Sequence, residues 1–152
     1  MSDLTFSVNG YNENPTKFVV KARNFQITID EPEALGGTNH AANPVEYLLA
    51  AYAGCLNVMG HIVARELNFE LKRLEIAIEG DLNPAKVFGQ PTTDRAGYKE
   101  IRVKLVPTAD IDEATLNRWL ETIESRCPVN DNLSNATPIQ VSLQKKTIDQ
   151  NS

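Results

Sequence analysis

Residues 43–68 read NPVEYLLAAYAGCLNVMGHIVARELN, and this apolar segment decides how the rest of the chain folds. Asn43 suits the cap of a helix, Pro44 suits the first helical position, and Glu46 stands three residues after the cap, where its carboxylate can return a hydrogen bond. Apolar residues occupy nearly all sides of this predicted helix, as is typical of a buried helix. The segment therefore predicts a homodimer, because one small chain has few other surfaces with which to cover such a helix.

Strands are predicted on both sides of the helix. Residues 4–11 and 17–30 alternate moderately and flank the turn NENP, which indicates a β-hairpin, and residues 74–82 and 98–107 alternate as half-buried strands do. A second helix should begin with the capping pair Asp110 and Glu113, run to about Arg126 and place Leu116, Trp119, Leu120, Ile123 and Cys127 on its inward face. TPIQVSLQKK, residues 137–146, reads as a last strand. The pattern predicts an α+β fold in which two central helices pack on antiparallel sheet.

The composition fits one domain over residues 1–152, with 41% hydrophobic residues to form a core. A net charge of −5 disfavours nucleic acid and anionic membrane surfaces as partners. We expect no membrane span, because no run reaches about 18 uninterrupted apolar residues, and the start MSDLTFSVNG has no signal-peptide pattern. The protein is therefore expected in the cytoplasm.

The chain has two cysteines, Cys55 and Cys127. In a reducing compartment a structural disulfide is uncommon, so both are either inert core residues or redox-active ones. A metal site is not expected, since Cys55 and His61 share one segment while His40 and Cys127 stand apart. No phosphate-binding loop, dinucleotide fingerprint or GxSxG motif is present, so we expect no cofactor.

The two cysteines differ in their local setting. Cys55 lies in the middle of the predicted helix, where the field of a helix end is weak, so its activation would need a nearby cation. Cys127 precedes Pro128, which disfavours helical geometry and puts this thiol at a helix end, where it can move. From the pattern alone, ordinary core packing remains the alternative for both residues.

Two segments resemble the OsmC/Ohr family of osmotically induced and organic-hydroperoxide-resistance proteins: DEPEALGGTNHAANPVEYLLAAYAGCL, residues 30–56, and ESRCPVNDNLSNATPIQVSL, residues 124–143. The resemblance implies an intertwined dimer with active sites at the subunit interface. It also implies that Cys55 attacks an organic hydroperoxide, or hydrogen peroxide, to form a sulfenic acid. Cys127 would then resolve this sulfenic acid as a disulfide, which an external thiol reductant of the dithiol or lipoyl type would reduce.

Two positions depart from the family pattern. The early turn NENPT has no arginine, and the residue after Pro44 is Val45 where the family has glutamate. Arg23, on the second predicted strand, is then the candidate for the activating cation, and Glu46 is the candidate for the carboxylate that orients it.

The residues Tyr52, Leu56, Met59 and Phe88 are candidates for an apolar substrate pocket. Two other functions stay open on the same fold. One is a non-enzymatic protein that binds a small apolar ligand, and the other is a redox sensor whose disulfide changes its affinity for a partner protein.

Overall fold

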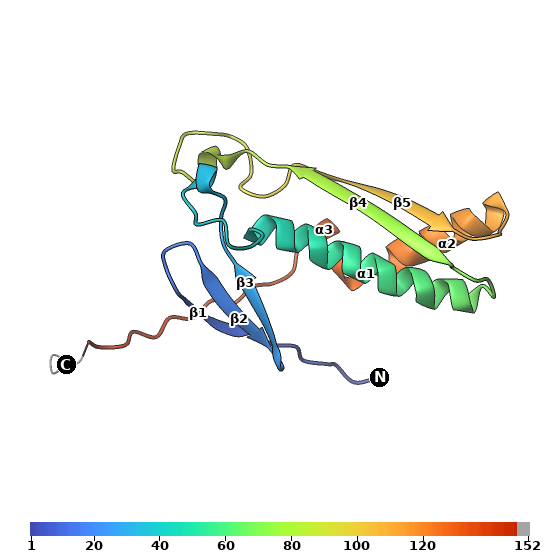
Figure 1. The fold of residues 1–152 in the computed structure, drawn as a ribbon, viewed down its shortest axis with the longest axis horizontal. Coiled ribbons are helices and arrows are strands. Elements are labelled where there is room, and N and C mark those ends of the chain that lie inside the picture. The colour runs from blue at the N-terminus through green and yellow to red at the C-terminus, as the bar shows by residue number, and fades with distance from the viewer. Residues whose placement is uncertain (149–152) are drawn as a thin grey trace.

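The computed structural model describes residues 1–148, which form an α+β fold with two antiparallel sheets and three α-helices (Figure 1). One sheet holds β1 (Asn9–Asn12), β2 (Phe18–Ala22) and β3 (Phe25–Ile29), and the other pairs β4 (Arg73–Asp81) with β5 (Glu100–Thr108). The helices are α1 (Pro44–Glu66), α2 (Glu113–Arg126) and α3 (Pro128–Ser134), with short 3₁₀ turns at Glu33–Leu35 and Pro84–Lys86. The predicted fold class is confirmed.

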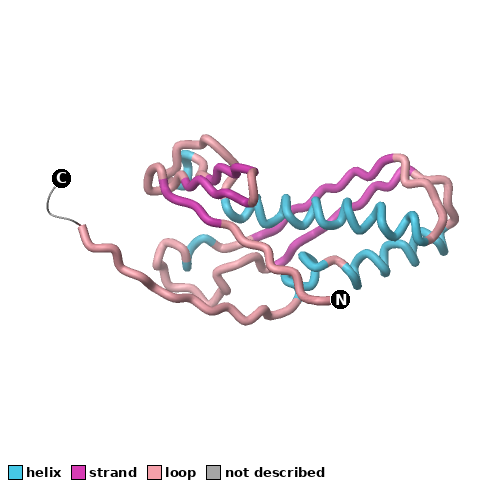
Figure 2. The backbone as a smooth tube through the Cα atoms, turned by 90° about the horizontal axis from the view of Figure 1, so that it is seen from below, coloured by secondary structure: helices cyan, strands magenta, loops and turns pink. Residues whose placement is uncertain are grey.

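The long helix α1 is the centre of this arrangement and packs against α2, α3 and β4. Its predicted capping box is confirmed: Glu46 N–H donates to Asn43 Oδ1 at 2.9 Å, and Asn43 N–H donates to Glu46 Oε2 at 2.8 Å. By length and composition alone α1 could cross a membrane, although the core helix of a globular fold has the same properties. The three-stranded sheet lies beside the N-terminal end of α1, whereas β4 and β5 run along the helix pair (Figures 1 and 2).

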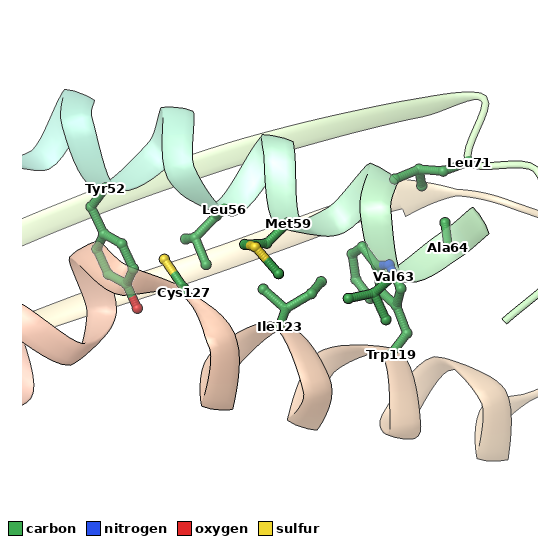
Figure 3. Packing of buried hydrophobic residues seen from close by; sticks show 9 residues of the cluster. All are labelled: Tyr52, Leu56, Met59, Val63, Ala64, Leu71, Trp119, Ile123 and Cys127. Atoms are coloured by element: carbon green, nitrogen blue, oxygen red, sulfur yellow. The ribbon is translucent and has the colours of Figure 1, made fainter. Parts of the chain in front are cut away.

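The core lies between α1 and α2 (Figure 3). Trp119 of α2 is 1% exposed, and its indole N–H donates to the Gly60 carbonyl of α1 at 2.8 Å. A Cβ at residue 60 would lie 3.0 Å from a methyl carbon of Leu74 and 3.2 Å from the Trp119 ring. Glycine at this position therefore lets the two helices and β4 approach closely. Ile123 and Cys127 continue the buried face of α2, as the sequence predicts.

Three predictions about the strands and caps are wrong in detail. The segment predicted as one strand over residues 17–30 is two strands, because Arg23 adopts a positive φ of 57° and turns the chain between β2 and β3. The first strand begins at Asn9, and the earlier residues are extended without a partner strand. The cap of α2 is Asp112 in place of Asp110, since the Asp112 side chain accepts the N–H of Thr115 at 2.7 Å.

The predicted last strand, residues 137–146, is not a strand in the described part of the chain. This segment leaves α3 as an extended arm that runs past the three-stranded sheet to the C-terminal end (Figure 1). A strand is defined by hydrogen bonds to a neighbouring strand, and this arm has none to pair with among residues 1–148. The period-2 pattern of the arm nevertheless persists as a row of exposed apolar side chains at Ile139, Val141 and Leu143.

Complete burial of α1 was also expected, and within one chain it is only partly achieved. The face with Tyr52, Leu56 and Val63 is buried, whereas Leu48, Val58 and Ile62 stay exposed, Val58 to 56%. The apolar surface on the second face is therefore left uncovered by the chain itself.

Asp30 ties together the loops that lead into α1. Its side chain is 0% exposed and accepts hydrogen bonds from Thr16 Oγ1 at 2.8 Å, from Glu31 N–H at 2.8 Å, from His40 N–H at 3.1 Å and from the Thr38 hydroxyl. Burial alone would raise the pKa of Asp30, but these hydrogen bonds outweigh it and hold the pKa well below its usual range. The ionised carboxylate thus joins the β1–β2 turn to residues 38–40.

This pKa predicts how stability depends on pH. Because the folded pKa is depressed, Asp30 contributes stability above the ordinary carboxyl value of about 3.9, and that contribution is lost as the pH falls below it. We expect Asp30→Asn to lower the free energy of unfolding at pH 6 and to flatten its decline between pH 5 and pH 3. Urea unfolding across this range measures both effects, with Asp3→Asn on the exposed N-terminal arm as the control. An undiminished decline in Asp30→Asn would contradict the assignment.

Candidate functional site

The two thiols, 72 positions apart in sequence, meet in space. Cys55 Sγ on α1 lies 3.0 Å from Cys127 Sγ, which stands where α2 ends and α3 begins. Both cysteines are free thiols; Cys55 is partly exposed, whereas Cys127 is 1% exposed. This separation is a hydrogen-bond contact, and only a small movement would bring the sulfur atoms to the roughly 2.05 Å of a disulfide. The prediction that two thiols approach each other is thus matched by the geometry.

A short hydrogen-bond network fixes the position of Cys127. Its sulfur accepts the N–H of Asn130 at 3.4 Å, as the cap of α3. The Asn130 side chain accepts the hydroxyl of Tyr52 at 2.7 Å and donates to the carbonyl of Glu124 at 3.0 Å. Tyr52 is one helical turn before Cys55, so Asn130 joins the helix that carries one thiol to the residues around the other. Figure 3 shows Cys127 beside Tyr52 and Leu56.

The local environment does not activate Cys55 in the single chain. Burial raises the pKa of the Cys55 thiol, and the adjacent Cys127 sulfur raises it further, while the backbone N–H of Val129 acts in the opposite direction. Burial likewise raises the pKa of Tyr52, with contributions from Cys127, Glu124 and Cys55, so this phenol stays neutral and donates its hydrogen bond. A reactive thiolate at neutral pH therefore needs an added positive charge.

A groove lies next to residues that neighbour the thiols, namely Tyr52 and Leu56 around Cys55 and Asn130 after Cys127, although neither cysteine is among the described residues that line it. One part, of about 410 Å³, is lined by residues that include Tyr52, Leu56, Leu105, Leu120, Glu124 and Asn130. A second part, of about 240 Å³, shares Tyr52, Ile101, Val103 and Asn130 with the first and extends to Arg95 and Lys99. We call these two parts together the thiol groove. It has apolar side chains such as Leu56 near Cys55, and its second part carries the cations Arg95 and Lys99 together with the acidic Glu100.

The structure places the other predicted site residues differently. Arg23 lies in the turn between β2 and β3, with its guanidinium 5.0 Å from the ring centroid of Phe25, and it is not among the residues that line the thiol groove. Glu46 is held in the capping box of α1. Met59 is buried in the helix core, and Phe88 is 58% exposed in a separate hollow. Of the predicted pocket residues, Tyr52 and Leu56 line the thiol groove.

Arg95 is a groove residue that sequence reasoning missed. It lies in the irregular segment between β4 and β5, where no periodic pattern distinguishes one charge from another. Tyr98 fastens this segment to α1 by donating its hydroxyl to the Val45 carbonyl at 2.9 Å. The neighbouring Lys99 lies 3.5 Å from Asp94, whereas Arg95 forms no ion pair with another residue of the described range 1–148. Arg95 is therefore a cation available to the thiol groove.

An α+β chain with two free cysteines in contact at the end of a helix pair defines a small dithiol protein. The family model described as OsmC-like protein matches residues 37–142, and the chain belongs to this family. The predicted family is confirmed. No curated protein matches the chain by sequence.

Solved structures of this family share the fold. An OsmC-like protein from Mycoplasma pneumoniae superposes with a TM-score of 0.76 at 19% identity, covering 88% of this chain and 89% of the other. An organic hydroperoxide resistance protein OsmC from Legionella pneumophila gives 0.63 at 19% identity, over 88% and 91% of the two chains. One named as an organic hydroperoxide resistance protein from Elizabethkingia anophelis gives 0.64 at 16%, over 86% and 89%. These similarities establish the fold alone.

Proposed function

We propose that this protein is a thiol peroxidase that reduces organic hydroperoxides, and hydrogen peroxide as a second substrate. The observation that carries the proposal is the 3.0 Å contact between Cys55 Sγ and Cys127 Sγ. Two cysteines that served only as packing residues would have no need to be in contact. The family membership and the relatives named for hydroperoxide resistance support the same reaction class.

The reaction divides into three balanced steps. The Cys55 thiolate attacks the O–O bond of the hydroperoxide, so that one oxygen becomes the Cys55 sulfenic acid and the remainder leaves as an alcohol. Cys127 then attacks the sulfenic sulfur, which forms the disulfide and releases water. An external dithiol, of the lipoyl or a similar type, reduces the disulfide and is itself oxidised. Cys55 takes the first role because it is the partly exposed thiol.

We also propose that the working unit is a homodimer in the cytoplasm. The exposed face of α1 and both terminal arms present apolar side chains, and in each arm these alternate so that they share one side: Leu4, Phe6 and Val8, and Ile139, Val141 and Leu143. An uncovered apolar surface of this extent is typical of an interface, and an extended arm gains hydrogen bonds by pairing with another chain.

Analytical ultracentrifugation tests this assembly. At micromolar concentration we expect the mass of two chains, because the arms and the second face of α1 would be covered together. The double variant Val58→Asp, Ile62→Asp should shift the sedimenting species toward a single chain, since charges would replace apolar contacts. The double variant Asp110→Asn, Glu113→Gln, at the exposed start of α2 and off the apolar face of α1, is the control. A single-chain mass for the parent protein would refute the dimer.

Activation of Cys55 requires the positive charge that its surroundings lack. Arg95 lines the thiol groove but does not act on Cys55 in the single chain, and Arg23, with Glu46 to orient it, would have to act from the second subunit. An opposite charge within about 4–6 Å shifts a pKa by roughly 1–3 units. Arg95 does not lower the pKa of Cys55 in the single chain, so the proposal requires its long side chain to approach the thiol in the working dimer. Arg95→Ala should then raise the pKa of Cys55 and slow oxidation at neutral pH about tenfold.

Thiolate absorbance against pH and stopped-flow oxidation rates measure these effects. Arg95→Lys should keep part of the charge, and Arg23→Lys and Arg23→Ala test the sequence-based candidate in the same way. Arg118→Ala, an exposed arginine of α2, is the control. If the Arg95 and Arg23 variants all match the parent, the activating group lies elsewhere.

The raised pKa of Cys55 favours a second candidate function, the non-enzymatic binding of a small apolar ligand in the thiol groove. In that case the thiols would pack as small hydrophobes, and the groove would serve binding alone. The two functions differ in whether peroxide consumes the thiols.

A further inference from the structure

A second hollow, of about 240 Å³, lies where the segment before α1 meets the loop that follows β4. Its apolar wall includes Leu35, Val45, Leu82, Pro84, Val87 and Phe88. No residue of this wall lines the thiol groove. We call it the Glu31 pocket after the acidic residue described next. Leu35, Val87 and Phe88 are exposed, so their apolar surfaces face solvent when the pocket is empty.

Glu31 is the acidic side chain on this wall, and its Oε2 atom is buried without a hydrogen-bond partner among residues 1–148. The backbone holds the residue in place. Its N–H donates to Asp30 Oδ1 at 2.8 Å, and its carbonyl accepts the N–H of Asn39 at 3.0 Å. The backbone of Gly37 packs so closely that a Cβ there would lie 1.8 Å from the Glu31 carbonyl oxygen. The backbone that carries this carboxylate is therefore fixed by its surroundings.

A buried carboxylate oxygen without a donor is costly, and native structures pair nearly all such atoms with a hydrogen-bond partner. A ligand that supplies this partner needs an N–H or O–H group for Oε2 and a remainder that suits the apolar wall. A cationic ligand is attracted both by the charge of Glu31 and by the net charge of −5 on the chain. The volume is below the roughly 300–1,000 Å³ of pockets for drug-sized ligands, so the molecule must be small.

We propose that the Glu31 pocket binds a small apolar molecule that carries a protonated amine. The ammonium N–H donates to Glu31 Oε2, and the apolar body lies against Val87, Phe88 and Leu35. This site is separate from the thiols and does not depend on the proposed peroxidase reaction. It would give the protein a second ligand, of the alkyl- or arylalkylammonium class.

Isothermal titration calorimetry with 2-phenylethylamine at pH 7 tests the proposal, using the full chain. We expect saturable binding of one amine per chain. The neutral 2-phenylethanol, of similar shape, should bind at least tenfold more weakly, and 3-phenylpropanoate should not bind, because its carboxylate would face Glu31. Glu31→Gln should weaken amine binding at least tenfold, and Phe88→Ala should weaken all binding several-fold.

The matched control is Glu33→Gln, which removes an exposed carboxylate two residues away and outside the pocket. It should bind the amine as the parent does, and circular dichroism melting checks that every variant is folded. Equal affinity for the alcohol and the amine would overturn the proposal, as would undiminished binding by folded Glu31→Gln. Absence of saturable amine binding would also overturn it.

Discussion

Replacing Cys55 by serine is expected to reduce peroxide consumption to the rate of the uncatalysed reaction. Serine keeps the size of the side chain, but its hydroxyl does not form the thiolate that attacks the O–O bond. The neighbouring Cys127 cannot take over this role, because it is 1% exposed and peroxide has little access to its sulfur. The loss should therefore be complete rather than partial, and a peroxide assay with a dithiol reductant measures it directly.

Cys127→Ser should behave differently. Cys55 would still be oxidised, so the variant should consume about one equivalent of peroxide per chain and then stop at the sulfenic acid or an over-oxidised form. Mass spectrometry of the intact protein, with a dimedone adduct to mark the sulfenic acid, distinguishes these products. Full turnover by Cys55→Ser, together with an inactive Cys127→Ser, would reverse the two roles.

The largest effect on stability is expected at Trp119. This ring is 1% exposed in the core between α1 and α2, packs edge-on against Phe69 with centroids 6.4 Å apart, and donates to the Gly60 carbonyl. Trp119→Ala should lower the free energy of unfolding by about 3–5 kcal/mol, because it removes buried area and leaves a cavity. Urea unfolding measures the change.

Two further variants separate the causes of this loss. Trp119→Phe keeps an aromatic ring but not the indole N–H, so it should lose less than the alanine variant does. Arg118→Ala, the exposed neighbour on α2, should change the stability by no more than about 0.5 kcal/mol. A similarly small loss in Trp119→Ala would show that the helix pair is not the core on which the site depends.

Features that depend on nearby residues could be predicted from the sequence. The capping box of Asn43 and Glu46 lies within four residues, and the inward face of α2 follows from helical periodicity, which also placed Cys127 on that face. The α+β class followed from the order of such local elements. The cap of α2 was misplaced by two residues because Asp110 and Asp112 both precede the helix and suit the same role.

Features that depend on distant contacts could not be predicted in this way. Residues 137–146 have the alternation of a strand, but alternation does not specify which edge they pair with, or on which chain. Phe88 was grouped with Tyr52 as a candidate for one apolar pocket, yet the loop after β4 carries Phe88 to a different hollow. Arg95 reaches the thiol groove through that same irregular loop, so no spacing in the sequence pointed to it.

The contact between the two thiols depends on both local and distant features. Periodicity indicated that Cys127 faces inward, but the 3.0 Å contact with Cys55 depends on how α1 and α2 pack around Trp119 and Gly60. The pairing of the two cysteines came from the family resemblance. Neither the periodicity nor the resemblance predicted the hydrogen bonds of Asn130 with Tyr52 and Cys127, which hold Cys127 in place.

The most direct test of the central claim is to treat the reduced protein with one equivalent of cumene hydroperoxide and to map its disulfides by mass spectrometry of a non-reduced digest. We expect that both thiols disappear together, that the peptides containing Cys55 and Cys127 of one chain are joined, and that a dithiol restores both. If both thiols remain free after this treatment, the protein is not a peroxidase of the proposed kind.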